Sequence, residues 1–366
     1  MTNKHLTIFI VCAVIIAAIL IPGLSDKPDQ SKLIKISVVM PFSGELAMFG
    51  DNVIHGVEIS LKQSGLSSST VEIIREDTGG FTTNGALSAF KRSIDQDKAD
   101  IVFGPFGPAQ TLTIAPTIGS SSQVTVISVS NCDERFEQYP TVFCIYPGLR
   151  DQVEHAIGFM KSKSWKNVYL LTENSEFGIM VEGILKEDEG VTFLGSEKVI
   201  PNQTKDFRTL ITKAVALKPD VIYSAFAPTE GLIVLRQYSN LSKGVPLYIG
   251  TDVNKQQLAD IFGQHSQNIY FAAKMSDTYE KVFADEFKDR YGRDPDYFAA
   301  LGHSAASILF DTIKSKSTDI SDLPKRLIGI TASTSAVRGF LFKENRTVSV
   351  PLHSYEFRNG DFVEVM

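Results

Sequence analysis

The sequence predicts an α/β protein in which helices cover parallel sheets. From Ile34 onward, short strand-like runs alternate with amphipathic helical patterns, which is the order that parallel sheets require. The first strand-like run is almost continuously apolar and β-branched, as expected for a strand buried on both faces. The chain has 366 residues, of which 43% are hydrophobic and 21% charged, so it is long enough for two globular domains with sizeable cores.

The first strand and helix locate the expected ligand crevice. Residues 34–40 form the apolar run, and helix-start residues follow from Gly50. Ligands of parallel sheets bind beyond the carboxyl ends of the strands. We therefore expect residues 41–50 to line a crevice, with Ser43 and Phe49 as its first candidate contacts.

The alternation continues along the chain. Further strands are expected at 71–74, 101–103, 124–129, 168–171, 191–194, 221–225, 247–249, 269–271 and 339–342. Further helices are expected at 85–94, 111–118, 151–161, 178–186, 206–216, 230–238, 279–291 and 297–313. The short extended segment 144–147 is interpreted as a crossover into a second lobe that repeats the plan of the first.

Charge and motif content argue against several classes of function. The net charge is −6 without a strongly basic tract, so nucleic acid is not an expected partner. Six His and three Cys without close pairs argue against a structural zinc site. No G-x-S-x-G, Walker A or H-E-x-x-H sequence occurs. We expect no catalytic residue, metal or cofactor, and we interpret His55 and His303 as packing or surface residues.

Residues 1–33 are expected to lie outside the fold. Lys4 precedes an apolar run at 6–21, which is typical of an export signal. As a helix this run would be roughly 24 Å long, which is marginal for a full membrane span. A cleaved signal peptide and an uncleaved anchor followed by a tether both remain open. Either one places the globular part in the periplasm or at the outer face of the cytoplasmic membrane.

Several segments resemble one protein family in its own order. The segment Pro41-x-Ser43-Gly44, followed by Phe49-Gly50, resembles the first strand–helix unit of the leucine/isoleucine/valine-binding protein family. Segments 206–231 and 291–295 continue the resemblance, which covers residues 34–360. These proteins are type I periplasmic solute-binding proteins of amino-acid ABC importers.

The resemblance implies the type I periplasmic binding protein fold. In that fold, two Rossmann-like lobes with parallel sheets are joined by a three-strand hinge. The implied first lobe comprises 34–146 and 272–350, and the implied second lobe comprises 147–271 and 351–366. The protein is expected to be a monomer.

The resemblance also implies ligand-binding residues. Asp252 falls where the family places the acid that holds a ligand ammonium, although a helix cap is its alternative role. Phe49, Phe177 and Phe226 fall at or near the family's aromatic pocket positions, although aromatics are equally common in cores.

Two departures from the family pattern concern the ligand carboxylate. Pro108 occupies the place of a carboxylate-binding Ser, so Gln110 or Thr111 is expected to substitute. Cys132 replaces a Thr in the second segment. The full set of candidate ligand contacts is Ser43, Phe49, Gly107, Gln110, Ser130, Asn131, Cys132, Phe177, Phe226 and Asp252. The ligand is therefore expected to be an amino acid, an amide or another small polar molecule.

Cys132 and Cys144 are the two cysteines of the exported part, twelve positions apart. A disulfide between them is expected in an oxidising compartment, and two unpaired core thiols are the alternative.

Three functions are weighed from these features. The first is a binding protein without catalysis, which delivers its ligand to an ABC permease. The second is a membrane-anchored sensor of the same fold, which reports to a receptor. The third, with least support, is a hydrolase that uses Asp252 or Glu173.

Overall fold

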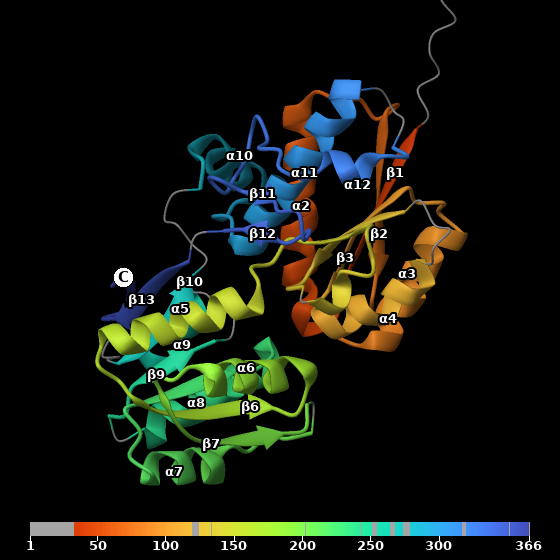
Figure 1. Cartoon of the computed structure of the whole chain (residues 1–366). Helices are drawn as coiled ribbons and strands as arrows, with labels where there is room; N and C mark the ends of the chain where they lie inside the picture. The colour runs from red at the N-terminus through yellow and green to blue at the C-terminus, as the bar shows by residue number, and fades with distance from the viewer. Residues whose placement is uncertain are drawn as a thin grey trace, which may run out of the picture. The chain divides into compact units, whose positions relative to one another are not determined.

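The computed structural model describes residues 33–118, 124–132, 134–201, 203–242, 244–250, 255–263, 268–273, 279–316, 320–350 and 352–365. Within residues 33–366 the chain builds two lobes, each consisting of one sheet with a hydrophobic core on either face (Figure 1). The predicted export segment lies outside the described residues. No helix of the described part is long and apolar enough to cross a membrane.

The first-lobe sheet has the strand order β2-β1-β3-β4-β5, and all its pairings are parallel. Its strands are β1 (Ile34–Met40), β2 (Val71–Asp77), β3 (Ile101–Phe106), β4 (Thr125–Val129) and β5 (Val142–Cys144). The central strands β1, β3 and β4 are almost entirely buried, which explains their continuous apolar sequence. A small hairpin of β11 (Leu341–Phe342) and β12 (Val348–Ser349) packs against this lobe.

The second-lobe sheet has the order β14-β13-β10-β9-β8-β6-β7. Its parallel part consists of β6 (Asn167–Glu173), β7 (Thr192–Val199), β8 (Val221–Ala225), β9 (Leu247–Ile249) and β10 (Ile269–Ala273). The last two strands, β13 (His353–Arg358) and β14 (Asp361–Glu364), pair antiparallel. Strand β7, predicted at 191–194, lies at the edge of the sheet and extends further than the apolar run indicated.

Helices cover both faces of each sheet. The first lobe has α2 (Ala47–Ser64), α3 (Thr83–Asp95), α4 (Pro108–Ile118), α10 (Lys281–Tyr291), α11 (Tyr297–Lys316) and α12 (Leu323–Arg326). The second lobe has α5 (Leu149–Ser162), α6 (Glu176–Glu187), α7 (Arg208–Ala216), α8 (Pro228–Leu241) and α9 (Lys255–Phe262). Two short 3₁₀ turns, η1 (Gly44–Leu46) and η2 (Glu134–Phe136), lie in first-lobe loops.

Helix α2 begins earlier than the sequence indicated. It starts at Ala47 rather than near Gly50, directly after η1. Its first turn packs so closely on the end of β1 that a Cβ at Gly50 would lie 2.2 Å from the carbonyl oxygen of Pro41. Phe49 is therefore held on the helix face that turns into the lobe.

The chain passes between the two sheets three times, after β5, after β10 and after β12. The first passage runs through residues 145–148. The other two include residues 274–278 and 351, which lie outside the described part of the chain. Strand β10 pairs in the second sheet as far as Ala273, two residues beyond the predicted lobe boundary.

Candidate functional site

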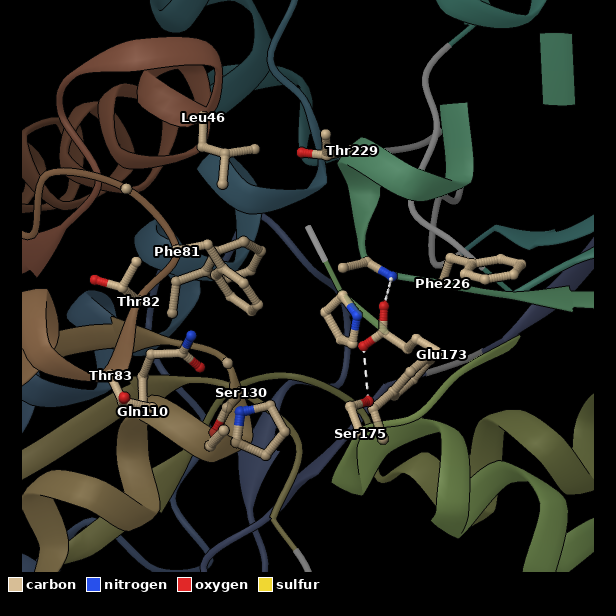
Figure 2. Close-up of a pocket in the computed structure, with 18 of the residues that line it drawn as sticks. Leu46, Phe81, Thr82, Thr83, Gln110, Ser130, Glu173, Ser175, Phe226 and Thr229 are labelled. Atoms are coloured by element: carbon tan, nitrogen blue, oxygen red, sulfur yellow. Dashed lines mark hydrogen bonds between the residues drawn. The ribbon is translucent and has the colours of Figure 1, made fainter. Parts of the chain in front are cut away.

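A cavity of about 740 Å³ is lined by residues of both lobes. Its walls come from the loops and helix starts that follow the carboxyl ends of β1 to β9. Figure 2 shows Phe81, Thr82, Thr83 and Gln110 on one side, with Glu173 and Ser175 on the other. The site therefore lies where parallel sheets hold their ligands.

Most of the candidate contacts line this cavity. Those that do are Ser43, Gly107, Gln110, Ser130, Asn131, Phe177 and Phe226. Phe49 does not line it, because its ring packs against Phe106 and Phe298 inside the first lobe. Cys132 does not line it either; its sulfur is bonded to Cys144. Asp252 lies outside the described residues.

Sequence reasoning missed several lining residues. These include Phe81, Thr82, Thr83, Tyr146 and Glu230, and it weighed Glu173 only as a hydrolase residue. Residues 79–83 follow the end of β2, and Glu173 is the last residue of β6. The rule that led to Ser43 would have found both groups if it had been applied to every strand end.

Asp77 ties together the two loops that follow β1 and β2. Its carboxylate accepts hydrogen bonds from the backbone N–H groups of Phe42 and Gly79, both at 2.9 Å. Partial burial alone would raise the pKa of Asp77, but these bonds and the Ser43 hydroxyl hold it below its usual range. Ser43 thus lines the cavity with its hydroxyl engaged by an ionised carboxylate.

The same helix-start construction occurs in both walls. Thr82 caps α3 by accepting the Gly85 N–H at 3.1 Å, and Ser175 caps α6 by accepting the Gly178 N–H at 3.3 Å. Each glycine allows a close approach of the preceding loop: a Cβ at either position would lie 2.0 Å from a backbone oxygen, that of Thr78 or of Glu173. Helix N-termini, with their favourable potential for anions, consequently face the cavity from both lobes.

The start of α4 explains how the chain accommodates Pro108. Pro108 is the first helical residue, where its missing N–H removes no helix hydrogen bond. Thr111 is fully buried and directs its hydroxyl to Ser128 at 2.6 Å, so it does not substitute for the replaced Ser. Gln110 does line the cavity; it is 5% exposed, and its Oε1 has no hydrogen-bond partner among the described residues.

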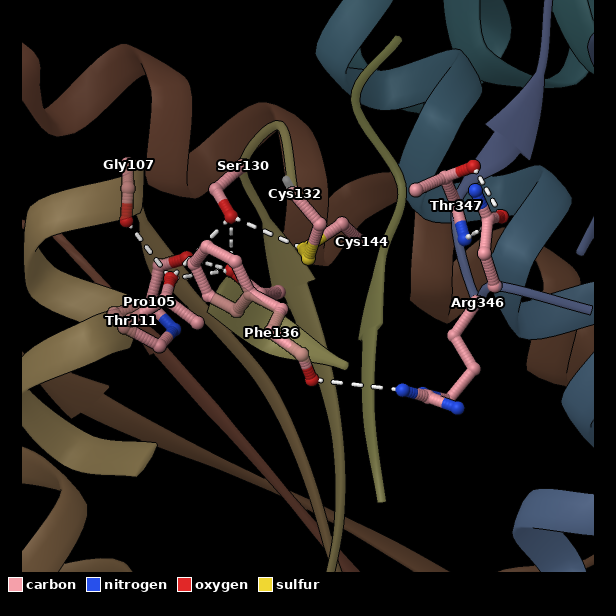
Figure 3. Close-up of a disulfide and its surroundings, with 11 residues drawn as sticks. Pro105, Gly107, Thr111, Ser130, Cys132, Phe136, Cys144, Arg346 and Thr347 are labelled. Atoms are coloured by element: carbon pink, nitrogen blue, oxygen red, sulfur yellow. Dashed lines mark hydrogen bonds between the residues drawn. A yellow bond between two sulfur atoms is a disulfide. The ribbon is translucent and has the colours of Figure 1, made fainter. Parts of the chain in front are cut away.

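The loop after β4 is held by a disulfide and by hydrogen bonds (Figure 3). Cys132 and Cys144 are bonded, with Cα atoms 5.7 Å apart. The Ser130 hydroxyl lies 2.9 Å from the Ser128 oxygen and 3.4 Å from the Cys144 sulfur. Arg346 donates to the backbone oxygen of Glu137 at 3.0 Å. Both ends of the loop behind Ser130 and Asn131 are thus fixed.

Glu173 is the central polar group of the second wall. Ser175 donates its hydroxyl to Oε1 at 2.7 Å, and the Ala227 N–H donates to Oε2 at 3.0 Å. Burial raises the pKa of Glu173; the two hydrogen bonds oppose this rise, and the nearby Glu230 charge adds to it. Glu230 also lines the cavity and is 4% exposed. Two buried carboxyl groups therefore stand in one wall.

An ion pair between the lobes lies at the cavity rim. Arg135, in the loop closed by the disulfide, contacts Glu176 of α6 at 2.7 Å. A second guanidinium nitrogen of Arg135 lies 3.5 Å from the sulfur of Met180. The first-lobe loop that supplies Asn131 thus also contacts the helix that begins the second wall.

The chain is similar to known proteins over most of its length. Residues 33–361 match the family described as "Periplasmic binding protein". The chain is 23% identical to "Leu/Ile/Val-binding protein homolog 7" of Brucella suis biovar 1 (strain 1330), over 99% of this chain and 96% of that protein. It is 22% identical to "Leu/Ile/Val-binding protein BraC3" of Rhizobium johnstonii, over 65% of this chain and 66% of that protein.

Solved structures share the fold. The branched-chain amino acid transporter substrate-binding protein LivJ of Streptococcus pneumoniae, in complex with isoleucine, superposes with a TM-score of 0.78 at 20% identity, covering 91% of this chain and 100% of that one. An ABC transporter solute-binding protein of R. palustris, in complex with benzoate, gives 0.79 at 16% identity, covering 91% and 95%. Similar folds therefore accept an amino acid in one case and an aromatic carboxylate in the other.

Proposed function

This chain belongs to the periplasmic binding protein family, and from that premise we propose that it captures an amino acid or a related small polar solute and delivers it to an ABC permease. The observation that carries the proposal is the cavity of about 740 Å³, which polar side chains from both lobes line. A volume of this size suits a small organic ligand. The isoleucine complex of LivJ and the names of the relatives support an amino acid, and the benzoate complex supports a wider range.

The proposed mechanism is binding coupled to closure of the lobes. A solute that contacts both walls stabilises the arrangement in which the walls face each other. Hydrogen bonds from the walls replace those to water, which a buried polar ligand requires. The permease then recognises the closed form. Because the family consists of exported proteins, we place this exchange on the outer side of the cytoplasmic membrane.

Thermal unfolding of the full chain with a panel of amino acids, amides and aromatic acids tests the capture step. A ligand at a hundred times its dissociation constant adds about 2.7 kcal/mol to the unfolding free energy, which raises the midpoint by several degrees. Uptake of the labelled solute by cells with and without this protein tests delivery. A panel without any shift contradicts solute capture, and binding without a change in uptake contradicts delivery in favour of a receptor as the partner.

A further inference from the structure

An aromatic side chain of the first lobe points into the cavity. Phe81 follows strand β2, lines the cavity and is half-buried against the first-lobe core. Figure 2 shows it on the first-lobe side, directed toward the cavity. Its loop is held by hydrogen bonds of its own, because the Thr78 hydroxyl donates to the Gly80 oxygen at 2.8 Å and Thr82 caps α3. The ring is therefore positioned without a solute, and little freedom is lost when one packs against it.

The neighbours of Phe81 shape the surface that it offers. Its ring meets that of Phe106 edge to face, with the centroids 5.3 Å apart and the planes at 62°. Phe106 is backed in turn by the stacked ring of Phe49 at 5.4 Å. Gly107 leaves the room for this arrangement, since a Cβ there would lie 2.7 Å from Cζ of Phe81, and its φ of +97° favours glycine. The two rings above Gly107 thus form a rigid apolar corner of the wall.

A second half-buried ring lines the cavity from the other lobe. Phe177, in the first turn of α6, is half-buried and lines the cavity. Phe226 lines it too, but is 3% exposed and packs its ring on Phe207 at 5.5 Å in the core. Among the described lining residues, Phe81 and Phe177 are the phenylalanines that remain partly accessible. Apolar surface open to water is unfavourable, and a solute with an apolar group gains free energy by covering it.

We propose that the solute carries an aromatic ring and that Phe81 is the residue that selects it. The inference rests on the proposed function and specifies the solute as a small molecule with a phenyl-type ring, a chemistry that aromatic amino acids and simple aromatic acids share. An aromatic ring has an electron-rich face and a positive edge, so it pairs with other rings edge to face or offset. Such pairs contribute beyond the area that they bury, a gain that a saturated or branched aliphatic group does not have.

Titration calorimetry on the full chain with two matched pairs of probes tests this assignment. The pairs are L-phenylalanine with L-cyclohexylalanine, and benzoate with cyclohexanecarboxylate. The members of a pair share their polar group and a six-carbon ring, and differ in aromaticity alone. In the pair that binds, the aromatic member should bind roughly 3- to 10-fold more tightly, and Phe81→Leu should reduce this ratio to within about twofold. The pair that binds more tightly also identifies the polar end of the solute.

Phe193→Leu is the matched control. Phe193 is a half-buried phenylalanine on strand β7 of the second lobe and is not among the residues that line the cavity. The substitution removes the same ring from a comparable environment, so it should leave both the affinities and their ratio unchanged.

The outcomes separate the two proposals, with L-leucine as a fifth probe. Equal affinities within a pair, or tightest binding of L-leucine, overturn the aromatic solute and leave solute capture standing. A ratio that Phe81→Leu leaves unchanged, or that Phe193→Leu reduces equally, overturns the role of Phe81. Failure of all five probes, together with the wider thermal panel, overturns the aromatic solute and counts against solute capture itself. If Phe81→Leu does not fold, the ratio in the unmodified protein still decides whether an aromatic ring is preferred.

Discussion

The two walls of the cavity share their construction and differ in their charge. In each, a hydroxyl residue caps a helix, Thr82 in the first wall and Ser175 in the second. In each, a glycine three residues later allows the preceding loop to approach. The described lining of the first wall carries no charged side chain, whereas the second ends its strand β6 with Glu173. The fold thus supplies helix starts on both sides, and a strand-end residue sets the difference in charge between the walls.

The lobes also differ in how they respond to acid. His303, on α11 of the first lobe, is 1% exposed. Its Nδ1 accepts the Ala336 N–H at 3.2 Å, so Nε2 carries the proton and donates to Gln63 Oε1 at 2.9 Å. Burial lowers the pKa of His303 to about 4, although the charge of Glu286 opposes the shift. His155, on α5 of the second lobe, is less buried, and its pKa is lowered by burial and then by His353.

The largest expected effect is therefore loss of first-lobe stability in acid. Above pH 6.5 the histidine is neutral in both the folded and the unfolded chain. As the pH falls toward 4, only the unfolded chain takes up the proton, so the unfolding free energy drops by about 3 kcal/mol. His303→Gln should remove most of this pH dependence, measured as the change in urea midpoint between pH 7.5 and 4.5. His155→Gln should remove less, and an equal effect of the two variants would contradict the difference between the lobes.

The accuracy of the predictions made from the sequence depends on the feature that carried each one. Strands β8 and β9 were predicted at their observed bounds, because a short, continuously apolar run reports burial directly. The contact of Phe49 was not predictable: an aromatic next to glycine looks the same whether its ring lines a cavity or packs inward, and a three-residue shift in the start of α2 decides between them. The partners of Glu173 were hidden because Ala227 lies 54 positions along the chain.

The disulfide gives the next largest effect, and the described residues place it in the first lobe alone. Replacing Cys132 and Cys144 by Ser should lower the unfolding free energy by about 2–3 kcal/mol, since the unfolded chain regains the freedom of a short loop. It should also weaken solute binding, because the loop supplies Asn131 to the cavity. Urea unfolding and calorimetry measure the two effects. Reductant should destabilise the unmodified protein and leave the double variant unaffected. Equal stability of the two proteins without reductant would contradict a stabilising role of the disulfide.

A glycine substitution examines the second wall. Gly178→Ala places a Cβ 2.0 Å from the Glu173 backbone oxygen, so the strand end must shift. We expect a loss of about 2 kcal/mol, typical of overpacking, together with weaker solute binding. Gly183→Ala in the same helix is the control, because its Cβ would meet nothing within 4 Å. It should stabilise α6 by roughly 0.5–1 kcal/mol. Equal thermal midpoints of the two variants would show that stability does not depend on the close approach of Gly178 to the Glu173 backbone.

The smallest expected effect concerns the contact between the walls. The Arg135–Glu176 pair is partly exposed, with 35% and 55% of its side-chain surfaces accessible, so its own contribution to stability is within about 1 kcal/mol. Because it joins the first-lobe loop to α6, Arg135→Ala should favour separation of the lobes and weaken solute affinity by about two- to fivefold. Arg150→Ala is the control: it removes an arginine, 57% exposed, that pairs with Glu187 within the second lobe, and it should leave the affinity unchanged. An equal loss of affinity in both variants would attribute the effect to the change in net charge of the protein. A loss confined to Arg135→Ala, with faster solute dissociation, would identify a contact between the lobes that helps to retain the solute.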